Sequence, residues 1–265
     1  MLELKNICKT FNKGTVNEKV AINNLSLTLE DGDFVTVIGG NGAGKSTMLN
    51  LIAGAFPVDS GSIIANGKDI TNLPDFKRAS ILGRVFQDPM MGTSANMLIE
   101  ENLALANRRG QKRGLRWGIS DAEREDFKKQ LSALNLGLED RLSTKVGLLS
   151  GGQRQALTLL MAVLRKPDLL LLDEHTAALD PKTAAKVLEM TDKIVSKHSL
   201  TTLMVTHNMK DAIEHGNRLI MMDAGRIVVD IRGEEKKKLT VPYLIDLFSK
   251  ASGSTEANDA MLLSK

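Results

Sequence analysis

Residues 39–47, GGNGAGKST, decide the fold of this chain. They match the pattern G-x-x-x-x-G-K-[ST], in which glycines let backbone N–H groups wrap around a phosphate chain. The pattern requires a strand before the loop and a helix after it. The apolar run 34–38 predicts that strand, and residues 45–53, followed by Gly54, predict that helix. A glycine-rich turn without a ligand is the alternative, but strand, loop and helix together favour a nucleotide site.

The residues of this loop have distinct chemical roles. The Lys45 ammonium neutralises the β- and γ-phosphates, and the Ser46 hydroxyl can bind Mg²⁺. The start of the following helix adds a favourable potential for an anion. We therefore predict that the nucleotide is bound by Gly39, Gly40, Asn41, Gly42, Ala43, Gly44, Lys45, Ser46 and Thr47.

An acidic pair ends a second apolar run, DLLLLDE, at residues 168–174. Such a run is typical of a parallel strand that is buried on both faces. Asp173 is placed to hold Mg²⁺, directly or through water, and Glu174 can polarise an attacking water as general base. Together with the phosphate loop, this pair predicts a core that hydrolyses a nucleoside triphosphate with the help of Mg²⁺.

The rest of the chain alternates between strand and helix signals. The first 85 or so residues are rich in strands and turns, including a hairpin around Asn66-Gly67. Residues 88–148 are charged and helical. From Gln153 an amphipathic helix, which Pro167 stops, is followed by strand runs at 200–207 and 218–230. This order predicts an α/β fold.

Composition limits the function classes. The chain has 265 residues, of which 42% are hydrophobic and 25% charged, enough for one domain with a subdomain. A net charge of +3 is too small to indicate nucleic acid as a partner. The single cysteine fits a reducing cytosol. No signal peptide or membrane-spanning run is expected, so other chains would have to cross a membrane.

A second possible anion site lies about a hundred residues after the first. In LLSGGQRQ, residues 148–155, Ser150, Gly151 and Gly152 stand at the predicted start of a helix. N–H groups at such a start, with no side chains in the way, can bind an anion.

At this point the chain resembles the ATP-binding subunits of ABC (ATP-binding cassette) transporters, from Leu2 to about Asp230. The motifs occur in the order of that family: the Walker A loop GGNGAGKST, the Q-loop VFQDP, the signature LSGGQ, Walker B LLLLDE, the D-loop ALD and the switch histidine in VTHN. Phe11, in KTFNKGT, stands where the family has an aromatic residue that stacks on adenine.

The resemblance implies a P-loop NTPase (ABC ATPase) core with an N-terminal antiparallel β subdomain and an inserted α-helical subdomain. Residues 1–248 would form one domain, in which 1–87 and 149–248 are the RecA-like core with the β subdomain. Residues 88–148 would be the helical subdomain. Residues 249–265 would be a flexible tail.

The resemblance also assigns roles to individual residues. The catalytic residues would be Glu174, His207 and Gln87, and the Mg²⁺ ligands Ser46, Gln87 and Asp173. Two copies would pair head to tail, so that ATP on one copy meets the signature of the other. This contact in trans would be made by Ser150, Gly151, Gly152, Gln153 and Asp180.

Three features have no assigned role. His175 departs from the family, which usually has proline there, and a tolerated substitution or an effect on Glu174 are both open. The basic segment 108–116 could contact a partner or be a solvated loop. Met90, Met91 and Met97 could pack against a partner helix or fill the core.

The resemblance implies an importer with separate permease subunits and, indirectly, a solute-binding protein. The ATPase would work as a homodimer or with a paired ATPase subunit, at the cytoplasmic face of the membrane and without nucleic acid. The sequences of residues 9–34 and 142–164 are most similar to those of amino-acid uptake ATPases of the tryptophan/tyrosine type. A soluble ATPase of cofactor-cluster assembly and a binding module that does not hydrolyse remain alternatives.

Overall fold

The computed structural model describes residues 1–111 and 118–252. The chain divides into two compact units, unit 1 (Met1–Arg78 and Ser199–Lys265) and unit 2 (Ala79–His198). Part of the basic segment (112–117) and most of the predicted tail (253–265) lie outside the described residues. The last helix runs to Ser252, four residues into the segment 249–265.

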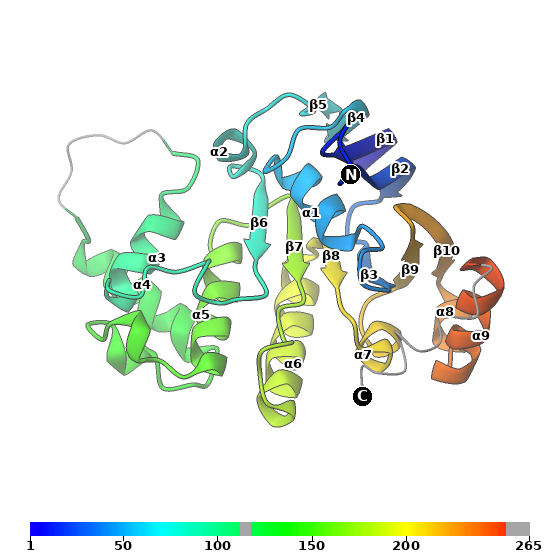
Figure 1. Ribbon diagram of the computed structural model, residues 1–265. Helices are drawn as coiled ribbons and strands as arrows, with labels where there is room; N and C mark the ends of the chain where they lie inside the picture. Colours follow the sequence, from blue (N-terminus) through cyan, green and yellow to red (C-terminus); the bar gives the residue numbers. More distant parts are fainter. Residues whose placement is uncertain (112–117, 253–265) are drawn as a thin grey trace. The chain divides into compact units, whose positions relative to one another are not determined.

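Unit 1 begins with an antiparallel sheet in the strand order β2-β1-β4-β5 (Figure 1). Its strands are β1 (Leu2–Phe11), β2 (Lys19–Leu29), β4 (Ser60–Ala65) and β5 (Lys68–Asp69). The hairpin predicted around Asn66-Gly67 is confirmed, since β4 and β5 pair antiparallel and both turn residues have positive φ, 49° and 72°. Alternate residues of β1 and β2 point into the core.

The second sheet of unit 1 carries the order β10-β9-β3-β8. The strands β3 (Phe34–Gly39), β8 (Thr201–Val205) and β9 (Arg218–Asp223) are parallel, and β10 (Arg226–Arg232) runs antiparallel to β9. The strand β8 is buried throughout, and β3 is buried up to its last residue, Gly39, as their apolar runs predict. The helices of this unit are α1 (Lys45–Ala53), α2 (Asp75–Arg78), α7 (Met209–Glu214), α8 (Glu234–Lys237) and α9 (Val241–Ser252).

Two buried arginines connect elements within unit 1 through hydrogen bonds. The guanidinium of Arg78, 2% exposed, donates to the carbonyl oxygens of Leu51 and Ile52 at 2.7 and 2.8 Å. It therefore satisfies the last turn of α1, where carbonyls have no partner within the helix. Arg218 makes a bidentate pair with Asp230, at 2.7 and 2.6 Å, and joins β9 to β10.

Unit 2 contains the parallel pair β6 (Leu82–Val85) and β7 (Leu169–Asp173). Its helices are α3 (Ile99–Asn107), α4 (Asp121–Ser132), η1 (Glu139–Arg141), η2 (Val146–Leu148), α5 (Gly151–Val163) and α6 (Pro181–His198). Phe127 and Leu131 of α4 and Leu157 of α5 lie in one apolar core, each 0% exposed. This core fixes the start of α5 against the helices from the middle of the chain.

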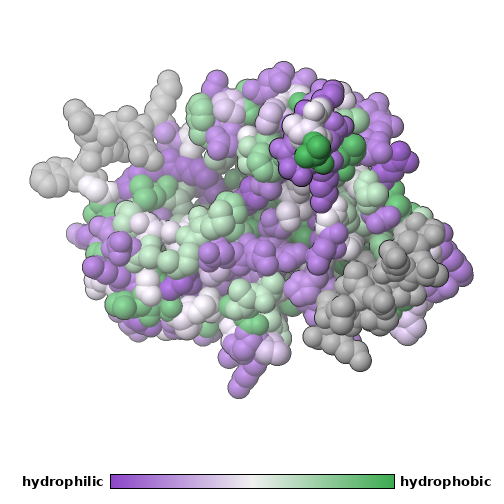
Figure 2. Space-filling model, viewed as in Figure 1, coloured by the Kyte–Doolittle hydropathy of each residue, from purple (hydrophilic) through white to green (hydrophobic). Residues whose placement is uncertain are grey.

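The α/β class and the antiparallel N-terminal sheet agree with the prediction. In the two described ranges, no helix is both long and apolar enough to cross a membrane. On the face of the molecule seen in Figure 2, hydrophilic and hydrophobic side chains are intermixed over the residues that are coloured.

Candidate functional site

The phosphate loop (residues 39–47) connects β3 to α1 in unit 1 (Figure 1). Glycine is required at both ends of its pattern. Gly39 has φ 155° and Gly44 has φ 100°. A Cβ at these positions would lie 2.3 Å from the Met222 oxygen and 2.6 Å from the Ala21 oxygen. The backbone of the loop therefore packs directly on the backbone of β9 and of β2.

Lys45 lies under this loop. It is 7% exposed, and its Nζ donates to the carbonyl oxygens of Gly39 at 2.7 Å and Gly40 at 3.1 Å. Gly44, which has no side chain to offer, is the N-cap of α1. The first N–H groups of α1 are thus left without a side-chain cap beside a buried cation, which is an arrangement that favours an anionic ligand.

His207 and Gly39 lie at the same edge of the parallel sheet. Val37 pairs with Val205, so Gly39 and His207 each follow two residues later on neighbouring strands. His207 is exposed. The nearby Asp211 carboxyl has a raised pKa because of burial, and the charge of His215 and His207 opposes that shift.

Phe11 ends β1 and is partly buried. Its ring meets that of Phe56 edge to face, with centroids 5.3 Å apart, and the Lys9 ammonium lies 5.6 Å from its centroid. The ring is therefore held in one orientation and keeps part of its surface accessible.

In unit 2, Gln87 and Glu174 likewise follow the same end of two paired parallel strands. Val85 of β6 pairs with Leu172 of β7, and each predicted residue follows two positions later. Glu174 has φ 45°, a left-handed conformation that is uncommon for a residue with a side chain. Backbone strain of this kind occurs often at active sites.

Asp173 has a partner that sequence reasoning missed. The Nη2 atom of Arg84, on β6, lies 3.7 Å from its Oδ2 atom. Burial lowers the pKa of the Arg84 guanidinium, and the Asp173 charge opposes that shift. The only signal in the sequence was an arginine within the short apolar segment ILGRVF, residues 81–86.

His175 is a buried residue, 2% exposed, beside Glu174. Its Nε2 lies 3.1 Å from the Thr191 hydroxyl, which itself donates to the Val187 carbonyl at 2.8 Å. Since the hydroxyl proton is used in that bond, Nε2 must be the donor to Thr191. His175 thus ties the residues after Glu174 to α6.

The signature loop (residues 148–153) starts α5 with a closed capping box. The Ser150 hydroxyl accepts from the Gln153 N–H at 3.3 Å, and the Gln153 side-chain oxygen accepts from the Ser150 N–H at 3.2 Å. The spacing Ser-x-x-Gln was the sequence signal for this box. A Cβ on Gly152 would lie 2.2 Å from Cγ2 of Thr183, so this glycine is also required by packing on α6.

Asp180 precedes α6, and its Oδ1 accepts from the Thr183 N–H at 3.1 Å. Hydrogen bonds from Thr183 lower the pKa of this carboxyl. Asp180 is exposed, so it caps the helix and still presents a charged group to solvent.

The structure thus gathers the predicted residues in two sets. Unit 1 holds Phe11, the phosphate loop and His207; unit 2 holds Gln87, the signature loop, Asp173, Glu174 and Asp180. The assigned roles of these residues remain predictions.

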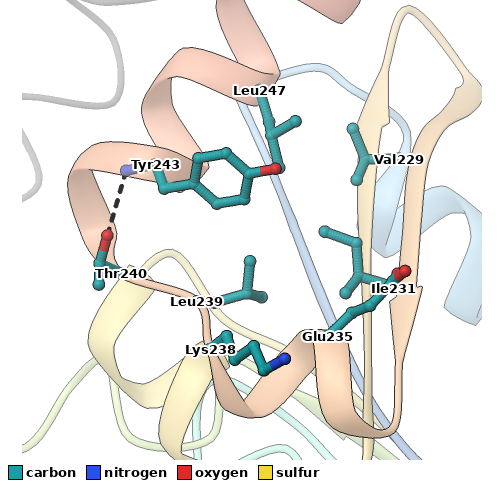
Figure 3. Close-up of a pocket in the computed structure, with 8 residues that line it drawn as sticks. All are labelled: Val229, Ile231, Glu235, Lys238, Leu239, Thr240, Tyr243 and Leu247. Carbon is teal, nitrogen blue, oxygen red and sulfur yellow. Dashed lines mark hydrogen bonds between the residues drawn. The ribbon is translucent and has the colours of Figure 1, made fainter.

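A pocket of about 650 Å³ lies elsewhere in unit 1 and contains none of the predicted residues. Figure 3 shows Leu247 and Tyr243 of α9 facing Val229 and Ile231 of β10 across it. The Tyr243 N–H donates to the Thr240 hydroxyl at 3.4 Å.

Comparisons with known proteins agree with these observations. The family model described as ABC transporter matches residues 22–177. The chain is 46% identical over 251 residues to the tyrosine transport ATP-binding protein of Clostridioides difficile, a match that covers 95% of this chain and 100% of that protein. It is 36% identical over 232 residues to the spermidine/putrescine import ATP-binding protein PotA of Haemophilus influenzae. This match covers 87% of this chain but 57% of that protein. A solved dimeric ATP-binding cassette in a post-hydrolysis state with ADP and Pi is similar at TM-score 0.75 and 29% identity, over 88% of this chain and 98% of the other.

Proposed function

We propose that this chain, which belongs to the ABC transporter family, drives the uptake of tyrosine or a related amino acid through separate permease subunits. It is an ABC ATPase, which binds ATP and hydrolyses it. The observation that carries the substrate proposal is the full-length likeness to a tyrosine transport ATP-binding protein. We assign the chain to the cytoplasmic face of the membrane, with a solute-binding protein as an indirect partner.

We assign the roles in ATP binding to residues of unit 1. Phe11 stacks on the adenine, and the phosphate loop binds the phosphates through its N–H groups. The buried Lys45 supplies positive charge to the β- and γ-phosphates. His207, at the same sheet edge as Gly39, donates a hydrogen bond to the γ-phosphate.

The roles in hydrolysis belong to unit 2. Glu174 takes a proton from the attacking water, and Gln87, at the same end of the β6–β7 pair, orients that water. His175 holds the segment that follows Glu174 through its bond to Thr191.

The proposed metal is Mg²⁺. Ser46, Gln87 and Asp173 offer a hydroxyl, an amide oxygen and a carboxylate, and Mg²⁺ prefers oxygen ligands of this kind. Its usual site combines one or two carboxylates with phosphate oxygens, which fits the single Asp173. When bound, Mg²⁺ would neutralise phosphate charge.

Cassettes of this family form dimers. In this chain, we assign the signature loop and Asp180 to contacts with the ATP held by a second copy, or by a paired ATPase. The start of α5 gives N–H groups for the γ-phosphate. An ATP bound by both copies favours the closed dimer, because only differential affinity can shift that equilibrium.

Unit 2 also carries the surface we assign to the permease. Met91 and Leu148 are 69% and 73% exposed, and Arg154 hydrogen-bonds the residue before each of them. The Arg154 guanidinium donates to the Met90 sulfur at 2.8 Å and to the Gly147 carbonyl at 3.1 Å. We assign residues 88–148 to the helical subdomain that makes this contact.

The first experiment replaces the proposed base. In Glu174→Gln, ATP binding should persist, while hydrolysis should fall by about 10²–10⁴-fold, the usual contribution of a general base. Sedimentation should then show an ATP-dependent dimer. Hydrolysis at the parental rate would refute the role of Glu174.

The second experiment tests the substrate. Cells that lack this chain should take up labelled tyrosine slowly, and the parental chain should restore uptake whereas Glu174→Gln should not. Tyrosine uptake that does not depend on the chain would reject this substrate and leave the ATPase assignment intact.

A further inference from the structure

A lysine outside the family motifs lies at the phosphate loop. Lys19 is the first residue of β2, and it pairs directly with Phe11 at the end of β1. Directly opposed residues of an antiparallel pair point to the same face of the sheet, with Cβ atoms about 5 Å apart. The stem of Lys19 therefore starts beside the ring of Phe11.

The other end of this side chain reaches the loop. The Nζ atom of Lys19 lies 3.3 Å from the position that a Cβ on Gly42 would take. Lys19 thus runs from the aromatic ring to the middle of the phosphate loop. A nucleotide with its base on Phe11 and its phosphates in the loop must follow the same path.

The turn before β2 fixes where Lys19 begins. The Thr15 N–H donates to the Asn12 carbonyl, and the Glu18 N–H to the Thr15 carbonyl, both at 3.1 Å. The Glu18 carboxylate accepts from the Gly14 N–H at 2.6 Å. The acidic neighbour of Lys19 is therefore bound within its own turn.

We propose that Lys19 is a second phosphate-binding lysine, which contacts the α- and β-phosphates of the bound nucleotide. Its position between Phe11 and Gly42 puts the ammonium at the base-proximal end of the phosphate chain. Lys45, buried beneath the loop, is assigned to the β/γ end. This inference rests on the proposed role of the phosphate loop.

The test measures the affinity of the full chain for ADP, ATP and adenosine by calorimetry. Lys19→Met should weaken both ADP and ATP by roughly three- to fivefold, as expected for an exposed charge pair, and leave adenosine unchanged. Lys19→Arg should keep most of the affinity. Lys13→Met, which removes an exposed lysine from the same turn, is the matched control and should bind like the parent.

Two outcomes would overturn the proposal: parental ADP affinity in Lys19→Met, or an equal loss for adenosine. Thermal unfolding of each variant shows whether the fold is kept. The variant Lys45→Met tests separately whether the phosphate loop binds the nucleotide. If Lys45→Met loses ADP affinity and Lys19→Met does not, only the inference about Lys19 fails.

Discussion

The chain has two helix starts suited to a phosphate, and they are built differently. At α1 the N-cap is Gly44, which offers no side chain, and a buried lysine lies beneath. At α5 the N-cap is Ser150, which closes a capping box with Gln153, and no lysine belongs to the loop. The first start has no side-chain cap, whereas the capping box of the second already bonds the N–H groups of Ser150 and Gln153.

This difference implies that the two loops contribute differently to nucleotide binding. A start with uncapped N–H groups and its own cation can bind a nucleotide alone. A start that is already capped gains less from an anion, so it contributes only when a phosphate is brought to it. We therefore expect the phosphate loop to determine affinity and the signature loop to determine dimerisation.

The largest effect should come from the cation. Lys45→Met should weaken ATP binding on the order of 10²–10³-fold, since losing one partner of a buried charge pair is costly. Ser150→Ala should leave the ATP affinity of the monomer unchanged. Calorimetry at a protein concentration below dimerisation checks both variants, and equal losses would remove the distinction between the two loops.

A packing change sharpens the comparison at the second loop. Gly152→Ala places a methyl group against Thr183, so we expect about 1–3 kcal/mol of destabilisation from overpacking. Adding Thr183→Ser removes the opposing methyl and should restore most of this loss. Chemical denaturation measures both. If the double variant stays as unstable as the single one, the glycine is required for another reason.

A smaller effect concerns the cap itself. Ser150→Ala should destabilise the fold by about 1 kcal/mol, the usual value of a lost N-cap. No equivalent substitution exists at the phosphate loop, because Gly44 makes no side-chain cap. An unfolding free energy equal to that of the parent would show that the box contributes nothing to α5.

The smallest effect is a pH dependence of unit 1. The hydrogen bonds from Arg218 lower the pKa of Asp230 from its usual 3.8. This pair therefore adds stability above pH 3.8, and that stability is lost as the pH falls through the lowered value. In Asp230→Asn, denaturation curves should depend less on pH in this acidic window. A parental pH profile would contradict the assignment.

The sequence predicted local structure best where glycine or an apolar run determined it. The helix 45–53 was predicted with the bounds that α1 has, since Gly44 and Gly54 end it on both sides with positive φ. Contacts between distant residues were not predicted. Arg78 beneath α1 and Lys19 at Gly42 meet their partners only after folding, and nothing in their local sequence indicates those partners.

The candidate site shows the same division. Motifs identified the residues, and strand register now explains why Gln87 and Glu174 share one end of a strand pair. The pairing of Asp173 with Arg84 and of His175 with Thr191 depends on which elements pack together, which periodicity alone does not determine.

One measurement tests most directly whether one ATP is shared by two copies. Glu174→Gln chains that also carry either Lys45→Met or Ser150→Arg are mixed, and ATP-dependent dimers are measured by sedimentation. Neither variant alone should dimerise, whereas the mixture should, because it rebuilds one site from an intact phosphate loop and an intact signature loop. Failure of the mixture to dimerise, or dimers of the Ser150→Arg chain alone, would contradict the account.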